Sequence, residues 1–234
     1  MFHFRQFSIA QDRTAMKVGT DSILLGAWVE SRSPQKILDI GSGSGLLSLM
    51  MAQKFAEAEI EGVEPDQDAC EQARENIAAS PWPNRIQIFQ QSIQYFGENK
   101  SYDLIISNPP YFPGDLKAKG DARIKARQGK NLDLESLLKH LGRLLTDNGQ
   151  AHIILPIDKM HALNSLLSLN KLHAHRICMV RPRPEKEPHR FLMELGKEAK
   201  SLIEEELIIQ IGAANHYSEA YKKLTQEFYA HELL

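Results

Sequence analysis

The sequence predicts an α/β fold, in which helices cover both faces of an open, doubly wound and mostly parallel sheet. Apolar runs of strand length alternate with amphipathic runs of helical length along the chain. Its 234 residues suffice for one domain with a substantial core. The hydrophobic fraction of 42% and the charged fraction of 25% are those of a soluble globular protein.

Seven segments are predicted to be strands, and an eighth, short strand can form at Glu205–Ile211. The seven are Lys36–Ile40, Glu59–Val63, Arg85–Gln90, Tyr102–Ser107, Gln150–Leu155, Ala174–Val180 and Arg190–Leu195. The predicted helices are Asp21–Glu30, Leu46–Phe55, Gln67–Ala79, Leu134–Leu145, Lys159–Leu169 and Ser218–Tyr229. Residues 1–234 are expected to form a single domain, with an N-terminal extension over residues 1–30 and a long loop over residues 114–131. Ligands of such folds bind beyond the carboxyl ends of the strands.

Composition excludes several classes of function. A net charge of −2 means that any polyanion site must come from local clusters of cations. Cys70 and Cys178 fit no disulfide or metal framework and are expected to be buried thiols in a reducing compartment. The nine histidines show no metal-ligand spacing, so no metal is expected. Because no signal segment or membrane-length apolar run is present, we expect a cytoplasmic protein without membrane contact, and nothing indicates an obligate protein partner.

The tetrapeptide Asn108-Pro109-Pro110-Tyr111 is the strongest functional signal, and it follows the predicted strand Tyr102–Ser107 directly. It combines an amide acceptor, a backbone stiffened by two prolines and an aromatic face. These groups suit a flat nitrogen nucleophile, such as an exocyclic amine or a carboxamide. An ordinary Pro-Pro turn after a buried strand is the alternative interpretation.

A glycine-rich loop follows the predicted strand Lys36–Ile40. It reads Gly41-Ser42-Gly43-Ser44-Gly45, which is neither the dinucleotide fingerprint nor a P-loop. Glu64, at the end of the next strand, can accept hydrogen bonds from both hydroxyls of a ribose. The loop and Glu64 therefore predict a nucleoside cofactor that carries no pyrophosphate.

Residues Leu38–Gly45, Glu64 and Asn108–Tyr111 together resemble the Rossmann-like methyltransferases that use S-adenosylmethionine and methylate amino nitrogens. The segment Gln11–Trp28 is similar to the opening of the bacterial tRNA adenine-N6 methyltransferases that modify the valine tRNA next to its anticodon. The resemblance extends from Phe7 to Tyr229. It implies a class I methyltransferase fold with seven strands, the last of them antiparallel, with S-adenosylmethionine as cofactor and tRNA as partner.

The resemblance also assigns cofactor contacts by matching position. The methionine part would be held by Gly41, Ser42, Gly43 and Gly45 and capped by Lys17, Gly19, Thr20 and Asp21. Asp39 would reach its amino group directly or through water, and Glu64 would hold the ribose. The family's third strand normally ends in an acid that binds the adenine amine; here Gln90-Gln91-Ser92 stands there, which leaves Ser92 or Gln91. Thr20 or Asp21 could instead simply cap the following helix.

The acceptor chemistry follows from the tetrapeptide. The Asn108 side-chain oxygen and the Pro109 carbonyl would accept the two N6 hydrogens of adenine and so direct its lone pair toward the methyl group. Tyr111 would stack on the purine, worth ~1–3 kcal/mol, while Pro110 stiffens the turn. Asn108 also borders the cofactor. Positioning supplies most of the catalysis, and no covalent nucleophile is needed.

Two basic segments are predicted to bind RNA phosphates. The loop over residues 114–131 carries Lys117, Lys119, Arg123, Lys125, Arg127 and Lys130. The connection between the last two predicted strands carries Arg181, Arg183 and Arg190 among three prolines. A solvated loop and a plain linker are the respective alternatives.

Other functions remain open from the sequence. Methyltransferases that act on a glutamine of release factors share the Asn-Pro-Pro-Tyr motif, but they carry a helical substrate domain, for which the residues before Lys36 leave little room. A noncatalytic RNA-binding module would not need both motifs intact. A DNA adenine methyltransferase would need a sizeable target-recognition domain, and the sequence offers no segment for one.

Overall fold

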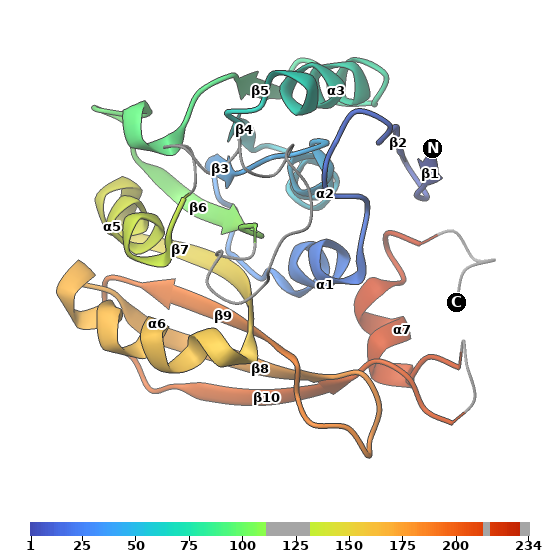
Figure 1. Cartoon of the computed structure of the whole chain (residues 1–234). Helices are drawn as coiled ribbons and strands as arrows, with labels where there is room; N and C mark the ends of the chain where they lie inside the picture. The colour runs from blue at the N-terminus through green and yellow to red at the C-terminus, as the bar shows by residue number, and fades with distance from the viewer. Residues whose placement is uncertain (111–131, 213–215, 230–234) are drawn as a thin grey trace, which may run out of the picture.

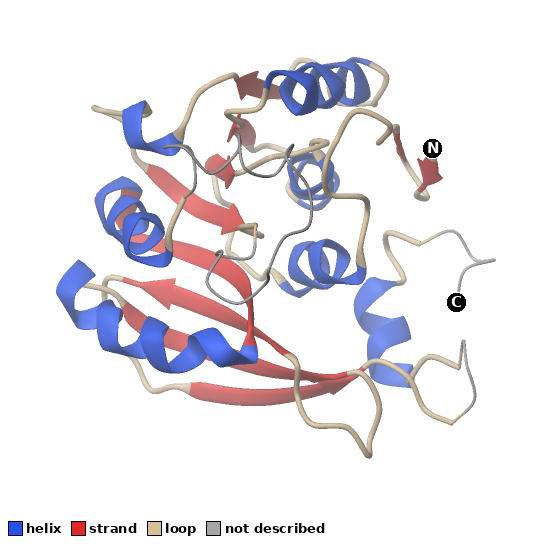
Figure 2. Ribbon diagram, in the orientation of Figure 1, coloured by secondary structure: helices blue, strands red, loops and turns tan. Residues whose placement is uncertain are grey.

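An eight-stranded mixed sheet lies at the centre of the computed structural model, which describes residues 1–110, 132–212 and 216–229. Helices pack on both of its faces (Figures 1 and 2). The strands are β3 (Lys36–Ile40), β4 (Glu59–Val63), β5 (Ile86–Phe89), β6 (Tyr102–Ser107), β7 (Leu145–Pro156), β8 (His173–Arg181), β9 (Arg190–Gly196) and β10 (Ile203–Ile208). The helices are α1 (Thr20–Trp28), α2 (Leu46–Lys54), α3 (Gln67–Ala78), α5 (Leu134–Leu144), α6 (Met160–Leu167) and α7 (Glu219–Thr225).

The strand order β10-β8-β9-β7-β6-β3-β4-β5 confirms the doubly wound fold. Strands β3 to β7 run parallel, and β9 is antiparallel to both β7 and β8, as the resemblance implied. The sheet has one strand more than the seven expected, because Ile203–Ile208 adds to the β8 edge. The short strand predicted at Glu205–Ile211 therefore starts two residues later in the chain than the observed strand β10. Glu204-Glu205-Glu206 hides the apolar signal, and edge strands commonly carry such charges.

Two apolar clusters hold the helices on the sheet. One face packs against α1, α2, α3 and α7 and the other against α5 and α6. Adjacent strand residues point to opposite faces, so Ile37 joins the first cluster and Leu38 the second. Cys70 and Cys178 are free and buried, as expected. Among the described residues no cluster of three or more His, Cys, Asp or Glu side chains could hold a metal ion. None of the described helices combines the length and the apolar character needed to cross a membrane.

The N-terminal extension packs on the domain. A short antiparallel pair, β1 (Phe2–His3) and β2 (Ser8–Ile9), is followed by a segment that runs past α3 into α1. The Phe4 and Phe7 rings stack at 4.7 Å between centroids, and Phe4 also lies 6.4 Å from the Tyr229 ring. The extension is further tied to α3, where Asn76 exchanges hydrogen bonds of 2.9 and 2.8 Å with the backbone of Ala10.

Short 3-10 turns complete the part of the chain that the structure describes. They are η1 (Ile93–Tyr95), η2 (Ile157–Lys159) and η3 (Ser168–Asn170). The segment predicted as one helix over Lys159–Leu169 is therefore α6 flanked by η2 and η3. The last predicted helix, Ser218–Tyr229, ends at Thr225.

Candidate active site

The predicted motifs meet at one edge of the sheet, because three adjacent parallel strands end there. The glycine loop follows β3, Glu64 follows β4 and Asn108 follows β6. Two hydrogen bonds join these ends. Gly43 N–H donates to Glu64 Oε2 at 2.9 Å, and the buried Ser107 hydroxyl donates to the Ile40 carbonyl at 2.8 Å.

The glycine loop turns through left-handed backbone conformations that disfavour other residues. The φ angles of Gly41, Gly43 and Gly45 are +78°, +52° and +81°. A Cβ placed on Gly41 or Gly43 would meet no atom within 4 Å. These two glycines are therefore needed for conformation, and open space lies beside their backbone.

Glu64 holds the loop and keeps capacity for a ligand. Its two carboxylate oxygens accept from Gly43 N–H at 2.9 Å and from Asp66 N–H at 3.0 Å. An ionised carboxylate offers about four acceptor positions, so about two remain. Burial is the main cause that raises the pKa of Glu64, and the two backbone hydrogen bonds act against it.

Asp39 is fully buried beneath the loop. Its Oδ2 accepts from the Ser48 N–H at 3.1 Å and from the Ser48 hydroxyl at 2.7 Å, which fixes the start of α2. Its Oδ1 has no hydrogen-bond partner among the described residues. Removal from water is the main cause that raises the pKa of Asp39 to about 7. The site thus contains a buried acceptor atom poised to titrate near neutral pH.

The amide of Asn108 is held in one orientation by α1. Its Nδ2 donates to the Ser22 hydroxyl oxygen at 2.8 Å. This contact leaves Oδ1, the acceptor atom, available on the other side of the amide. Pro109 is buried and Pro110 is exposed, so the turn is anchored on one side only. Tyr111 lies outside the described residues.

The four upstream candidates lie at the start of α1. Gly19 is the N-cap residue of α1, so the alternative in which Thr20 or Asp21 caps this helix is wrong. Asp21 Oδ2 accepts from Arg190 Nε at 2.8 Å, and both side chains are 21% exposed. Lys17 donates to the Gln11 carbonyl and is exposed. Asp21 therefore ties the first turn of α1 to the start of β9.

Ser92 follows β5 and precedes η1, where an acid would stand in the resembled family. It is half-buried, and its hydroxyl donates to the side chain of Gln94. Neighbouring Gln91 donates to the Tyr95 carbonyl at 2.7 Å. Neither contact identifies which residue meets an adenine, so the assignment to Ser92 stays a prediction.

The predicted RNA-binding cations divide into two groups. Lys117, Lys119, Arg123, Lys125, Arg127 and Lys130 lie outside the described residues. In the second group, Arg181 binds Glu206 and the Lys186 carbonyl, and Arg190 binds Asp21. Arg183 is half-buried and has no side-chain hydrogen bond or ion pair to the described part of the chain. Acidic neighbours thus partly neutralise this group.

Three residues of the site were not identified from the sequence motifs. Ser22 contacts Asn108 across 86 positions of sequence. Asn76 donates to the Ser44 carbonyl at 2.8 Å and so joins the loop to α3. Gly62 lies beside Ser42, whose Oγ would be 2.3 Å from a Cβ at position 62. A glycine inside a strand can mark such a close approach, so Gly62 is the one of these three residues that the sequence could have indicated.

Comparison with known proteins gives the class of this chain. Residues 14–155 match the Methyltransferase small domain family, which defines the chain as a methyltransferase-fold protein. A predicted O-methyltransferase from Agrobacterium tumefaciens has a similar fold, with a TM-score of 0.67 at 18% identity over 91% of this chain and 98% of that one. A ribosomal protein L11 methylase from Lactobacillus delbrueckii subsp. bulgaricus gives a TM-score of 0.55 at 17% identity, over 76% of this chain and 78% of that one.

Sequence relatives narrow the class. A protein of Vibrio vulnificus named tRNA1(Val) (adenine(37)-N6)-methyltransferase is 41% identical over 97% of this chain and 95% of its own length. A protein of the same name from Bacteroides thetaiotaomicron is 40% identical over 98% of this chain and 97% of its own length. The chain belongs to the family of these tRNA1(Val) (adenine(37)-N6)-methyltransferases.

Proposed function

We propose that the protein transfers a methyl group from S-adenosylmethionine to the N6 amine of the adenine at position 37 in a valine tRNA, the reaction for which its relatives are named. One observation supports it above the others. The Asn108 amide stands at the carboxyl end of β6 with its nitrogen engaged by Ser22, which leaves its oxygen to accept from an amine. Because its substrate would be a tRNA, we expect the protein to act in the cytoplasm.

The residues at the sheet edge fit the cofactor. The buried Asp39 Oδ1 lacks a partner, and a cationic amino group could supply one directly or through water. Glu64 has acceptor positions left for the two ribose hydroxyls. Open space beside Gly41 and Gly43 would admit the methionine part against bare backbone. When bound, S-adenosylmethionine supplies a methyl group on a positively charged sulfur, a strong electrophile.

The protein's part in the reaction is positioning. Asn108 Oδ1 and the Pro109 carbonyl would each accept one N6 hydrogen and orient the nitrogen lone pair. A nitrogen held in this way would accept the methyl group that S-adenosylmethionine supplies, with the carbon–sulfur bond as the bond that breaks, and would lose its extra proton to solvent. An adenine in an anticodon loop reaches such a site at lower cost than one in a duplex, because it has no paired partner to lose.

A protein glutamine is the second candidate acceptor, since its carboxamide is also planar. The names of the relatives favour adenine. The experiment measures transfer of labelled methyl groups from S-adenosylmethionine to bulk tRNA, a release factor and DNA, followed by nucleoside analysis. N6-methyladenosine in tRNA alone is expected. Label in the release factor or in DNA, with none in tRNA, would refute the proposal.

The role of the Asn108 amide is tested by the variant Asn108→Ala. Losing a preorganised contact of this type costs on the order of 10²-fold or more in kcat. Cofactor affinity, measured by calorimetry, should stay close to that of the wild type. Near-normal turnover by a folded Asn108→Ala protein would contradict the assigned role.

A further inference from the structure

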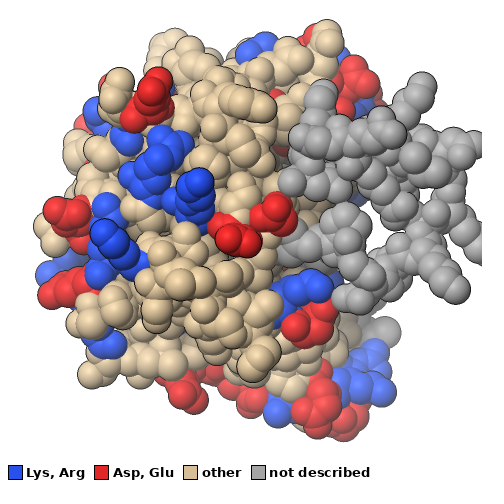
Figure 3. Space-filling view, turned by 60° about the vertical axis from the view of Figure 1, so that its left-hand side comes forward, with Lys and Arg blue, Asp and Glu red and all other residues tan. Residues whose placement is uncertain are grey.

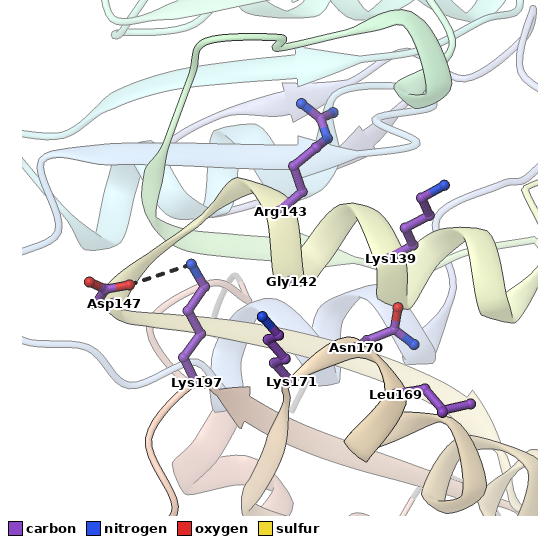
Figure 4. A pocket seen from close by; sticks show the side chains of 8 residues that line it. All are labelled: Lys139, Gly142, Arg143, Asp147, Leu169, Asn170, Lys171 and Lys197. Carbon is purple, nitrogen blue, oxygen red and sulfur yellow. Dashed lines mark ion pairs between the residues drawn. The ribbon is translucent and has the colours of Figure 1, made fainter.

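A basic pocket lies at the pole of the molecule opposite the candidate active site. It has a volume of about 520 Å³ and lies where α5, η3, the start of β7 and the end of β9 meet (Figure 4). Its charged lining consists of Lys139, Arg143, Lys171 and Lys197 with one acid, Asp147. Four cations against one carboxylate give a local charge of about +3 in a chain whose net charge is −2.

The fold brings these cations together from separate elements. Lys139 lies midway along α5, and Arg143 lies in its last turn, where the carboxyl end of the helix attracts positive charge. Gly142 lets the η3 backbone approach, because a Cβ there would lie 2.5 Å from the Asn170 carbonyl oxygen. Lys171 follows in the left-handed conformation, with φ of 54°. The pocket is thus formed by the close packing of α5 against η3.

Most of the positive charge in the pocket is not neutralised by carboxylates. Lys139 and Lys171 are exposed, and their side chains form no hydrogen bond or ion pair with the described residues. Lys197 Nζ lies 3.6 Å from Asp147 Oδ1, but the Asp147 side chain is 97% exposed, so this contact is weak. Arg143 donates to the carbonyls of Phe96 and Gly97 at 2.8 and 2.7 Å. Backbone carbonyls fix its guanidinium without cancelling its charge.

The backbone that Arg143 holds follows an exposed aromatic residue. Tyr95 is 82% exposed and directly precedes Phe96, whose carbonyl Arg143 binds. In Figure 3, which brings this side of the molecule forward, Lys and Arg side chains gather on the visible face.

We infer that this basic pocket binds two phosphates of the tRNA backbone, remote from the nucleotide that reacts. The inference rests on the proposed function. Strand β6 leads from Tyr102, paired with Leu145 near the pocket, to Ser107 beside Asn108. Six residues at about 3.3 Å each separate the two sites by about 20 Å. The RNA must pass around the sheet, so at about 3.4 Å per nucleotide step the bound phosphates are at least about six steps from the target adenine.

The test compares two double variants with equal charge loss. Lys139→Ala with Lys171→Ala alters the pocket, and Lys222→Ala with Lys223→Ala on α7 is the control on a distant helix. Arg143 is kept, because it holds the backbone at η1. Binding of full-length valine tRNA is measured by fluorescence anisotropy from 50 to 200 mM salt. Steady-state kinetics and circular dichroism accompany it.

Loss of two phosphate contacts should lower the salt slope by about 1.4–1.8. When salt rises fourfold, from 50 to 200 mM, the ratio of the wild-type affinity to the affinity of the pocket variant should fall by about 7- to 12-fold. The KM for tRNA should rise while kcat stays the same, and the α7 control should match the wild type. A hairpin with the target loop and three base pairs reaches only about 10 Å, so its KM should not change.

Each outcome decides one claim. Equal salt slopes and KM values for a folded pocket variant and the wild type, with normal tRNA methylation, would overturn the phosphate site alone. An equal loss in the α7 control would mean that only overall charge matters and would also overturn it. Absence of methyl transfer to tRNA by the wild-type protein would overturn the proposed function and this inference together.

Discussion

Asp39 should make both folding stability and cofactor affinity depend on pH in a way that Asp39→Asn abolishes. An aspartate in the unfolded chain loses its proton near pH 4, whereas burial raises the pKa of Asp39 to about 7 in the fold. Between these values the folded protein binds more protons than the unfolded chain. The contribution of Asp39 to stability is therefore full below pH 4 and falls as pH rises toward 7, by about 1.4 kcal/mol per pH unit. The total is about 4 kcal/mol.

A buried histidine acts in the opposite direction. His152 is fully buried, and desolvation lowers its pKa to about 3, so its contribution is present above pH 6.5 and is lost as pH falls. The two slopes nearly cancel between pH 4 and 6.5 in the wild type. The measurement is therefore the difference in unfolding free energy between Asp39→Asn and wild type, from urea titrations at pH 4.5 to 8. Asp158→Asn, whose side chain is 55% exposed, is the control.

The affinity for the cofactor should depend on pH in the opposite direction and rise with pH. A cationic amino group beside Asp39 favours the ionised carboxylate, so binding should release a proton below pH 7. Calorimetric affinity of S-adenosylmethionine should rise by about tenfold from pH 6 to 8 in the wild type. It should be flat in Asp39→Asn. A stability difference that does not change with pH, together with parallel affinity curves, would refute the reasoning.

Two further predictions address neighbouring groups. Glu64→Ala should weaken S-adenosylmethionine binding by about 1.5–3 kcal/mol, the scale of hydrogen bonds to a charged group, without affecting tRNA affinity. Calorimetry checks it, with Glu61→Ala on β4, the strand that precedes Glu64, as the control. Unchanged cofactor affinity in Glu64→Ala would exclude the ribose role. Ser22→Ala should lower kcat by about 2- to 13-fold, one hydrogen bond of about 0.5–1.5 kcal/mol, with KM for the cofactor unchanged. Ser22→Thr, which keeps the hydroxyl, should restore kcat, and equal rates for Ser22→Ala and wild type would show that Asn108 needs no such positioning.

The fold could be predicted largely from the sequence, because its signals are local. Continuous apolar runs identify β3 and β6, and the glycines after β3 require left-handed conformations. Strand β10 was placed two residues late because its acids mask the pattern. At the site, proximity of the motifs followed from parallel topology alone, since the carboxyl ends of neighbouring strands share one edge.

Orientation at the site could not be predicted, because it depends on contacts between distant residues. The Asn108 amide is aligned by Ser22, and Asp21 is engaged by Arg190 across 169 positions of sequence. Ser22 lies in the segment Gln11–Trp28, but the similarity of that segment does not identify Asn108 as its partner. Arg190 shows the consequence. Sequence pattern predicts that it binds RNA, which stays a prediction, and the structure adds that its side chain holds the start of α1.

The N-terminal extension therefore belongs to the site. Ala10 is hydrogen-bonded to Asn76, which also holds the glycine loop through the Ser44 carbonyl. Farther along the same segment, the first turn of α1 supplies Ser22 to the acceptor amide. One segment thus contacts both the cofactor side and the acceptor side. Its position relative to both must be fixed for the methyl group and the amine to meet, since an error of about 1 Å can cost on the order of 10²-fold in rate.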